Sequence, residues 1–233
     1  PVCRILRVMD VATGKDLADE IRWVKFSSLA WAKDGSGFYY SRFPEPAEGA
    51  AFQSLNENHA VYFHRLGTPQ SADVLTHASP DKPKLNNSAV VTDDGKYLLV
   101  VGSEGTDERY GLTLYATGKP GAKPMVLVDD YANNWEYVTN TGTRFTFLTN
   151  KDAPRQRIVS MDIKKPGVLT QLVGEEDATL VGASRVGDRM ILSYLGDAKS
   201  QARIVALDGK PVANINLADI GSAVGFGGKA SDP

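Results

Sequence analysis

The sequence has few of the residues on which disulfide, metal or histidine chemistry depends. Its 233 residues contain one cysteine, Cys3, so no disulfide forms within the chain and no cysteine-based zinc site is expected. There are three histidines, His59, His64 and His77. His59 and His64 lie an odd number of residues apart on an expected strand, so they face opposite sides and share no metal ion. We interpret each histidine as a surface or packing residue and predict no metal or cofactor.

Charge of one sign is not in excess, and long apolar runs are lacking. The chain has 26 basic and 28 acidic residues, a net charge of −2, without the basic clusters of nucleic-acid-binding or membrane-surface proteins. No apolar run approaches the ~20 residues that span a bilayer. The first residues, Pro-Val-Cys-Arg, are not a signal peptide, and the missing initial Met indicates a piece of a longer polypeptide. We expect a soluble protein, cytoplasmic or periplasmic, that binds neither nucleic acid nor membrane.

Catalytic motifs are also lacking. A serine hydrolase carries its nucleophile on a Gly-x-Ser-x-Gly turn, and the nearest run, residues 182–186, lacks the second glycine. Adjacent carboxylates such as Asp93 and Asp94 point apart on a strand or turn, unlike the facing pair of a glycosidase. The glycine-containing loops at residues 102–105 and 225–228 lack the Lys-Ser/Thr of a phosphate-binding loop. We therefore predict no catalytic residue in this chain.

Helical periodicity is scarce, and a β-hairpin unit repeats instead. Expected strands at Ser28–Ala32 and Gly37–Arg42 are joined by a turn in which Gly35 can take a positive φ. Similar inner hairpins follow at Ala89–Glu104, Tyr137–Asn150 and Gly182–Leu195, and a further copy starts at Gly221. An outer hairpin comes after each inner one, with first strands near His59, Gly111, Arg155 and Gln201, and the segment Arg4–Val11 begins another.

The repeat predicts an all-β fold, a β-propeller of four-stranded antiparallel blades. The unit recurs about every 45 to 60 residues, near the period of a propeller blade. A sandwich or irregular barrel fits the spacing too, but does not need repeated outer hairpins. We expect the outer half of one blade at 1–22, blades at about 23–80, 81–131, 132–176 and 177–219, and the start of the next at 220–233. The aromatic residues Trp23, Phe26, Trp31, Phe38, Tyr39 and Tyr40 are interpreted as wedges between sheets.

Several runs resemble one family along nearly the whole chain. They are WVKFSSLAWAKDGSGFYYSRFPEP, VYFHRLGTPQSADVL, DDGKYLLVVGSEGTDERY and YVTNTGTRFTFLTNKDAP. Together they resemble the propeller of prolyl oligopeptidase, the post-proline serine peptidase, with the acylaminoacyl peptidase and oligopeptidase B branches as near alternatives. In that family a seven-bladed propeller caps an α/β-hydrolase domain that holds the Ser-Asp-His triad. The resemblance implies that this chain supplies about five blades of the cap and is inactive alone.

The resemblance also implies a substrate pocket with changed residues. Phe26 stands where the family has a phenylalanine that lines the pocket. Asn86 replaces a methionine, and Ser103 and Thr106 replace an arginine and a cysteine. A polar edge and a lost guanidinium put tight acceptance of bulky apolar groups in doubt.

A gating loop is implied as well. The stretch from Arg42 to His59 matches a mobile loop near the domain junction, and it contains Pro44, Pro46, Glu48 and Gly49. Arg42 and Glu48 are expected to contact the junction, although a plain solvated loop fits the same composition.

Two functions of different class follow. The first is the substrate-gating part of a post-proline serine endopeptidase whose partners are the hydrolase domain of the same polypeptide and short proline-containing peptides. The second is a stand-alone propeller-like module that binds peptide or protein without catalysis. Continuation of the gene product into a Gly-x-Ser-x-Gly elbow distinguishes the first from the second.

Overall fold

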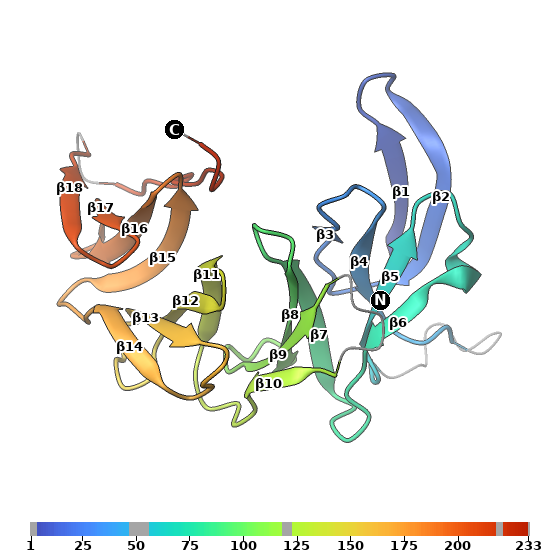
Figure 1. Cartoon of the computed structure of the whole chain (residues 1–233), viewed down its shortest axis with the longest axis horizontal. Coiled ribbons are helices and arrows are strands. Elements are labelled where there is room, and N and C mark those ends of the chain that lie inside the picture. The colour runs from blue at the N-terminus through green and yellow to red at the C-terminus, as the bar shows by residue number, and fades with distance from the viewer. Residues whose placement is uncertain (1–3, 47–55, 118–122, 218–220, 233) are drawn as a thin grey trace. The chain divides into compact units, whose positions relative to one another are not determined.

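The computed structural model describes residues 4–46, 56–117, 123–217 and 221–232. Within these residues the regular elements are strands, apart from one 3-10 turn, η1, at Gln70–Ala72. The strands lie in one six-stranded and three four-stranded sheets, and their pairs are antiparallel (Figure 1). The predicted all-β architecture of four-stranded antiparallel sheets is confirmed. No described helix is long or apolar enough to cross a membrane.

The chain divides into two compact units, residues 1–107 with 111–126 and residues 108–110 with 127–233. The first unit holds the six-stranded sheet and most of one four-stranded sheet. The six-stranded sheet consists of β1 (Arg4–Asp10), β2 (Lys15–Val24), β3 (Ala30–Trp31), β4 (Gly37–Arg42), β5 (Ala60–Arg65) and β6 (Val74–His77). The four-stranded sheet consists of β7 (Leu85–Val91), β8 (Tyr97–Glu104), β9 (Gly111–Ala116) and β10 (Met125–Val128).

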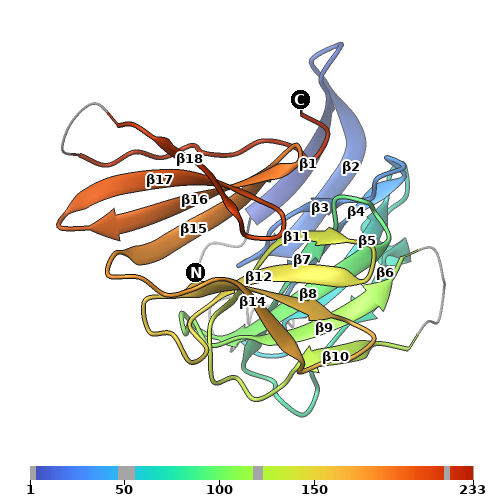
Figure 2. The same ribbon diagram turned by 60° about the vertical axis from the view of Figure 1, so that its left-hand side comes forward.

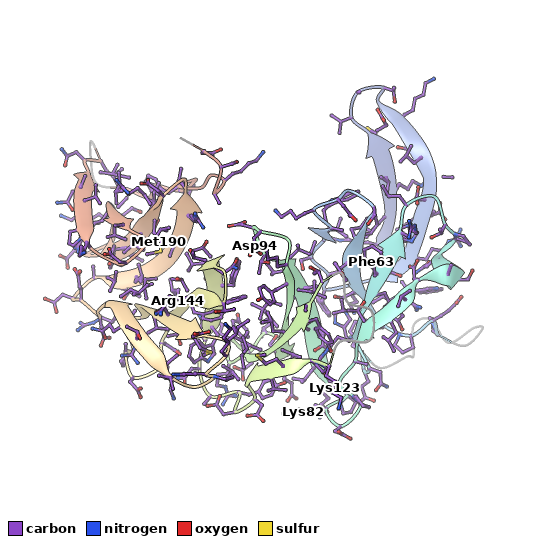
Figure 3. All side chains as sticks on the ribbon, viewed as in Figure 1. Phe63, Lys82, Asp94, Lys123, Arg144 and Met190 are labelled. Carbon is purple, nitrogen blue, oxygen red and sulfur yellow. The ribbon has the colours of Figure 1, made fainter. Side chains whose placement is uncertain are left out.

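The second unit contains the other two sheets, which follow one another along the chain (Figure 2). Their strands are β11 (Trp135–Thr141), β12 (Arg144–Thr149), β13 (Arg157–Asp162) and β14 (Leu169–Val173), then β15 (Thr179–Val186), β16 (Arg189–Gly196), β17 (Lys199–Ala206) and β18 (Pro211–Ile215). A shared core joins them, in which Leu148 and Ile158 of the first sheet pack with Met190 and Leu192 of the second. Figure 3 labels Met190, which lies within the second sheet. Burial of these apolar side chains is the main stabilising term between sheets that share no hydrogen-bonded strands.

The inner turns have the backbone that the repeat predicted. Gly35 has a φ of 69°, and the matching glycines Gly95, Gly142 and Gly187 have φ values of 68°, 58° and 57°. Asp34 supports its turn, since its Oδ1 accepts a hydrogen bond from the backbone N–H of Ser36 at 3.0 Å. These conformations suit glycine because an L side chain is disfavoured at positive φ.

Two expected strands differ from the structure. The first strand of the first inner hairpin covers only Ala30–Trp31, because Ser27 and Ser28 bond through their side chains to Ser41 N and Ala89 O. Residues 221–232 contain no strand, although a first strand of a further hairpin was expected there. That segment lies beside β15, where the N–H of Gly187 donates to Lys229 O at 3.0 Å.

The aromatic interpretation is correct only in part. Phe38 and Tyr40 are 1% and 0% exposed and belong to the core of the first unit. Phe26 and Trp31, by contrast, are 58% and 45% exposed. Alternation along β4 buries Phe38 and Tyr40 on one face, whereas Phe26 stands in an irregular segment to which no period applies.

Candidate functional site

Phe26 projects from the irregular segment between β2 and β3. Its φ is 52°, a left-handed value that is costly for a residue with a bulky side chain. Neighbouring bonds hold this backbone, since the Ser27 hydroxyl oxygen accepts from Ser41 N at 2.8 Å and donates to Ser28 O at 2.7 Å. A phenyl ring is thus presented to its surroundings at a fixed place.

Two groups flank the exposed Phe26 ring. The ring of Phe43 meets it edge-on, with 6.3 Å between the centroids and 81° between the planes. The Lys25 ammonium lies 5.0 Å from the centroid of the same ring and donates to Asn56 Oδ1 at 2.9 Å. An apolar ring beside a cation can accept an apolar group and attract a partial negative charge.

The other three predicted pocket residues lie together on β7, β8 and the turn that follows. Asn86 of β7 is the cross-strand partner of Ser103 of β8, and both are half-buried. The Asn86 Nδ2 donates to Gly105 O at 3.3 Å, which ties this pair to the turn that carries the exposed Thr106. The three side chains therefore form one polar group within the first unit.

His59 lies between Phe26 and this polar group. Its side chain is buried, with 1% of the residue exposed. Its Nε2 is 2.8 Å from Lys25 O, and its Nδ1 accepts from the backbone N–H of Asn87 at 2.9 Å. The Asn87 side chain donates in turn to His59 O at 2.7 Å. Burial lowers the pKa of His59 to about 4, against the raising effect of its bond to Lys25 O.

The predicted gating residues have different environments. Arg42 ends β4, and its guanidinium carbon lies 4.2 Å from the centroid of the Tyr62 ring. Pro44 is exposed and Pro46 half-buried, whereas Glu48 and Gly49 lie outside the described residues, as does Cys3. His59, at the other end of the stretch, is held by the bonds above.

Sequence reasoning missed a second buried group, built around His64. Its Nδ1 is 2.7 Å from Asp73 Oδ1 and its Nε2 is 2.9 Å from Asp19 Oδ1. The Tyr40 hydroxyl donates to Asp73 Oδ2 at 2.7 Å. Burial raises the pKa of Asp19, but hydrogen bonds from His64 and from Gly67 N outweigh it and hold that pKa below its usual value.

The His64 group joins four segments of the six-stranded sheet, because Asp19 comes from β2, Tyr40 from β4, His64 from β5 and Asp73 from the loop before β6. Of the two interpretations given for His64, surface or packing residue, burial favours packing, since 0% of the residue is exposed. No sequence signal links Asp19 to a histidine 45 positions away. Among the described residues, no group of three or more His, Cys, Asp or Glu side chains is arranged to hold a metal ion.

A known family matches this chain over almost its full length. The family model described as prolyl oligopeptidase, N-terminal beta-propeller domain, matches residues 3–233. A prolyl endopeptidase of Elizabethkingia meningoseptica is 32% identical over 227 residues, which cover 97% of this chain and 32% of that protein. Prolyl oligopeptidase A of Galerina marginata is 32% identical over 217 residues, 89% of this chain and 29% of that protein.

Solved structures show the same fold. One comes from a study of two prolyl endopeptidases and of inter-domain dynamics in their catalysis and specificity; it superposes with a TM-score of 0.89 at 38% identity and covers 99% of this chain and 33% of that one. Prolyl oligopeptidase B from Galerina marginata, bound to a 35mer hydrolysis and macrocyclization substrate, gives a TM-score of 0.85 at 24% identity, over 94% of this chain and 32% of that one. The predicted propeller fold is confirmed, and the chain spans about a third of the length of the curated relatives it matches.

Proposed function

This chain belongs to the prolyl oligopeptidase N-terminal β-propeller family, and on that premise we propose that it is the substrate-gating part of a post-proline serine endopeptidase. The observation that carries the proposal is the family match over residues 3–233. The complete enzyme hydrolyses short peptides on the carboxyl side of proline. Its partners are therefore short proline-containing peptides and the α/β-hydrolase domain of the same polypeptide.

In this proposal, substrate binding and bond cleavage are assigned to different domains of the complete enzyme. A serine nucleophile, its histidine base and the orienting carboxylate come from the hydrolase domain. The propeller contributes binding and access, which raise specificity without taking part in bond cleavage. Each four-stranded sheet is assigned to one blade, at about 81–131, 132–176 and 177–219. The six-stranded sheet is assigned to the outer half of one blade at 1–22 and to the blade at about 23–80, and a further blade begins near 220.

The pocket wall is assigned to Phe26, Asn86, Ser103 and Thr106. The exposed Phe26 ring supplies apolar contact for a peptide residue on the amino side of the proline. Asn86, Ser103 and Thr106 supply a polar edge, so this pocket accepts small or polar side chains better than large apolar ones. Support comes from the position of these four residues in one unit, connected through His59 and Gly105.

The gate is assigned to the stretch that starts at Arg42 and includes Pro44, Pro46 and Glu48. Arg42 anchors its beginning by stacking on Tyr62, and His59 anchors its end by hydrogen bonds. A loop beside a domain junction can control access to a cavity. It admits extended peptides and excludes folded proteins by size.

The test uses the complete gene product that contains this chain. We expect it to react with a fluorophosphonate serine probe and to release nitroaniline from succinyl-Gly-Pro-nitroanilide. Replacement of proline by alanine in the substrate is the control and should abolish most of the release. A product that neither labels nor cleaves would contradict the peptidase and leave the binding module.

A further inference from the structure

His59 connects two segments that are distant in sequence and that each carry a pocket residue. Lys25, whose carbonyl meets His59 Nε2 at 2.8 Å, directly precedes Phe26. Asn87, whose N–H meets His59 Nδ1 at 2.9 Å, directly follows Asn86. One buried imidazole thus spans the backbone between the apolar and the polar sides of the pocket.

The two partners determine the hydrogen on the ring. A backbone carbonyl only accepts and a backbone N–H only donates, so Nε2 carries the hydrogen and Nδ1 has none. The neutral ring satisfies both backbone groups. A side chain at position 59 that lacks either the donor or the acceptor leaves the carbonyl of Lys25 or the N–H of Asn87 without a hydrogen bond.

Ring packing adds a second connection between His59 and Phe26. The centroid of the buried Phe43 ring lies 4.5 Å from that of His59 and 6.3 Å from that of Phe26. Phe43 therefore lies in contact with both, and a shift of the imidazole moves the ring against which Phe26 rests. Because Phe26 has a left-handed backbone, its position depends on such neighbours.

We propose that His59 is a positioning residue that sets the spacing between Phe26 and Asn86. Through that spacing it sets the specificity of the peptidase for the substrate residue two positions before the proline. The inference rests on the proposed function and assigns His59 a role other than gating. His59 itself does not touch the peptide, since it is buried beneath the two segments.

The experiment compares two substrates in the complete enzyme. Acetyl-Pro-nitroanilide reaches only the proline pocket, whereas succinyl-Phe-Gly-Pro-nitroanilide extends to the residue in question. For His59→Leu we expect kcat/KM on the longer substrate to fall about tenfold more than on the shorter one. His59→Gln keeps one donor and one acceptor and should restore the ratio to within about threefold.

Two controls separate positioning from general destabilisation. Thr149→Val removes two part-buried hydrogen bonds in the second unit, from Thr149 Oγ1 to Asn134 O at 2.6 Å and from Lys151 N to Thr149 Oγ1 at 3.2 Å, and should leave the substrate ratio unchanged. In a Phe26→Ala background, His59→Leu should change the ratio less than about twofold, because the ring it positions is gone. Active-site titration with the serine probe corrects every rate for the folded fraction.

The outcomes are distinguishable. A wild type that cleaves neither substrate overturns the proposed function, and this inference with it. An active wild type whose substrate ratio survives His59→Leu overturns the positioning role alone. The positioning role is also overturned if His59→Gln does not restore the substrate ratio. It is likewise overturned if His59→Leu lowers the ratio as much in the Phe26→Ala background as in the wild type. Either result assigns His59 to general stability.

Discussion

The two buried histidines of the first unit have different partners. His59 meets one backbone donor and one backbone acceptor, which a neutral ring satisfies. His64 meets a side-chain carboxyl oxygen at each nitrogen, from Asp73 and from Asp19. Both rings are compatible with burial because each ring nitrogen has a hydrogen-bond partner.

The first prediction concerns the Phe26 ring. Phe26→Ala in the complete enzyme should lower kcat/KM for succinyl-Phe-Gly-Pro-nitroanilide by about 1–3 kcal/mol of transition-state binding, because an apolar pocket contact is lost. Trp31→Ala, which truncates another half-exposed ring, is the matched control. Steady-state kinetics on both variants check the prediction, and equal effects of the two would remove Phe26 from the pocket.

The second prediction concerns pH. Burial lowers the pKa of folded His59 to about 4, while an unfolded histidine titrates near 6.5. Below pH ~6.5 the unfolded chain therefore takes up a proton that the folded chain does not, so stability present at pH 7 is lost as the pH falls toward 4. The free energy of unfolding falls by on the order of 3 kcal/mol over this pH range.

Urea unfolding of wild type and His59→Gln at pH 7 and pH 5 measures this effect. The wild type should lose more of its free energy of unfolding between the two pH values than the variant does. Burial lowers the pKa of His77 as well. The wild type and the variant therefore share the acid-induced loss of stability that comes from His77, and only the difference between them reports on His59. Identical losses in the two proteins would refute the assignment to His59.

At the scale of single elements, strand β4 depends on a residue without a side chain at its start. A Cβ on Gly37 would lie 2.0 Å from His64 O and 2.9 Å from the Phe63 ring, below any contact distance. Gly37 is the cross-strand partner of Arg65, next to the pair formed by Phe38 and His64. The close approach of β4 and β5 therefore places the His64 group as well as the first inner hairpin.

The third prediction follows from that contact. Gly37→Ala should lower the free energy of unfolding by about 1–3 kcal/mol or more, because β4 and β5 must separate to admit the methyl group. Gly182→Ala is the matched strand substitution, because a Cβ on Gly182 would lie at an ordinary contact distance, 3.9 Å, from Ser193 Cβ. It should change stability by less than about 0.5 kcal/mol. Urea midpoints of both variants are the measurement, and a neutral Gly37→Ala would contradict it.

At the scale of the whole molecule, the proposed function assigns pocket walls and access to this chain and bond cleavage to a hydrolase domain. The sheets of this chain are stabilised by apolar cores within each unit, such as the one around Met190. A propeller that works as a filter acts on substrate size, a property that no single residue of the pocket determines.

The fourth prediction tests that filter. A short peptide that contains Gly-Pro should be cleaved by the complete enzyme, while the same sequence in a surface loop of a folded protein should remain intact. The physical reason is exclusion from the cavity, so unfolding of the carrier should restore part of the cleavage. Mass spectrometry of the products measures both, and equal rates on peptide and folded carrier would rule the filter out.

The sequence by itself determined most of the strands, the inner turns and the family. Alternation buried Phe38 and Tyr40 on one face of β4, and glycine was placed at each inner turn because only positive φ closes it. Both signals act between residues a few positions apart, so they can be read along the chain. The family runs supported the propeller, and the pocket positions that they imply remain a prediction.

Only the tertiary structure decided which distant residues meet. It put Asp19 and Asp73 on His64, and it put His59 between Lys25 and Asn87. It also left Phe26 exposed with a left-handed backbone. These contacts depend on which strands pair and on how closely two backbones approach. A local sequence pattern cannot predict them, because the partners lie on different segments of the chain.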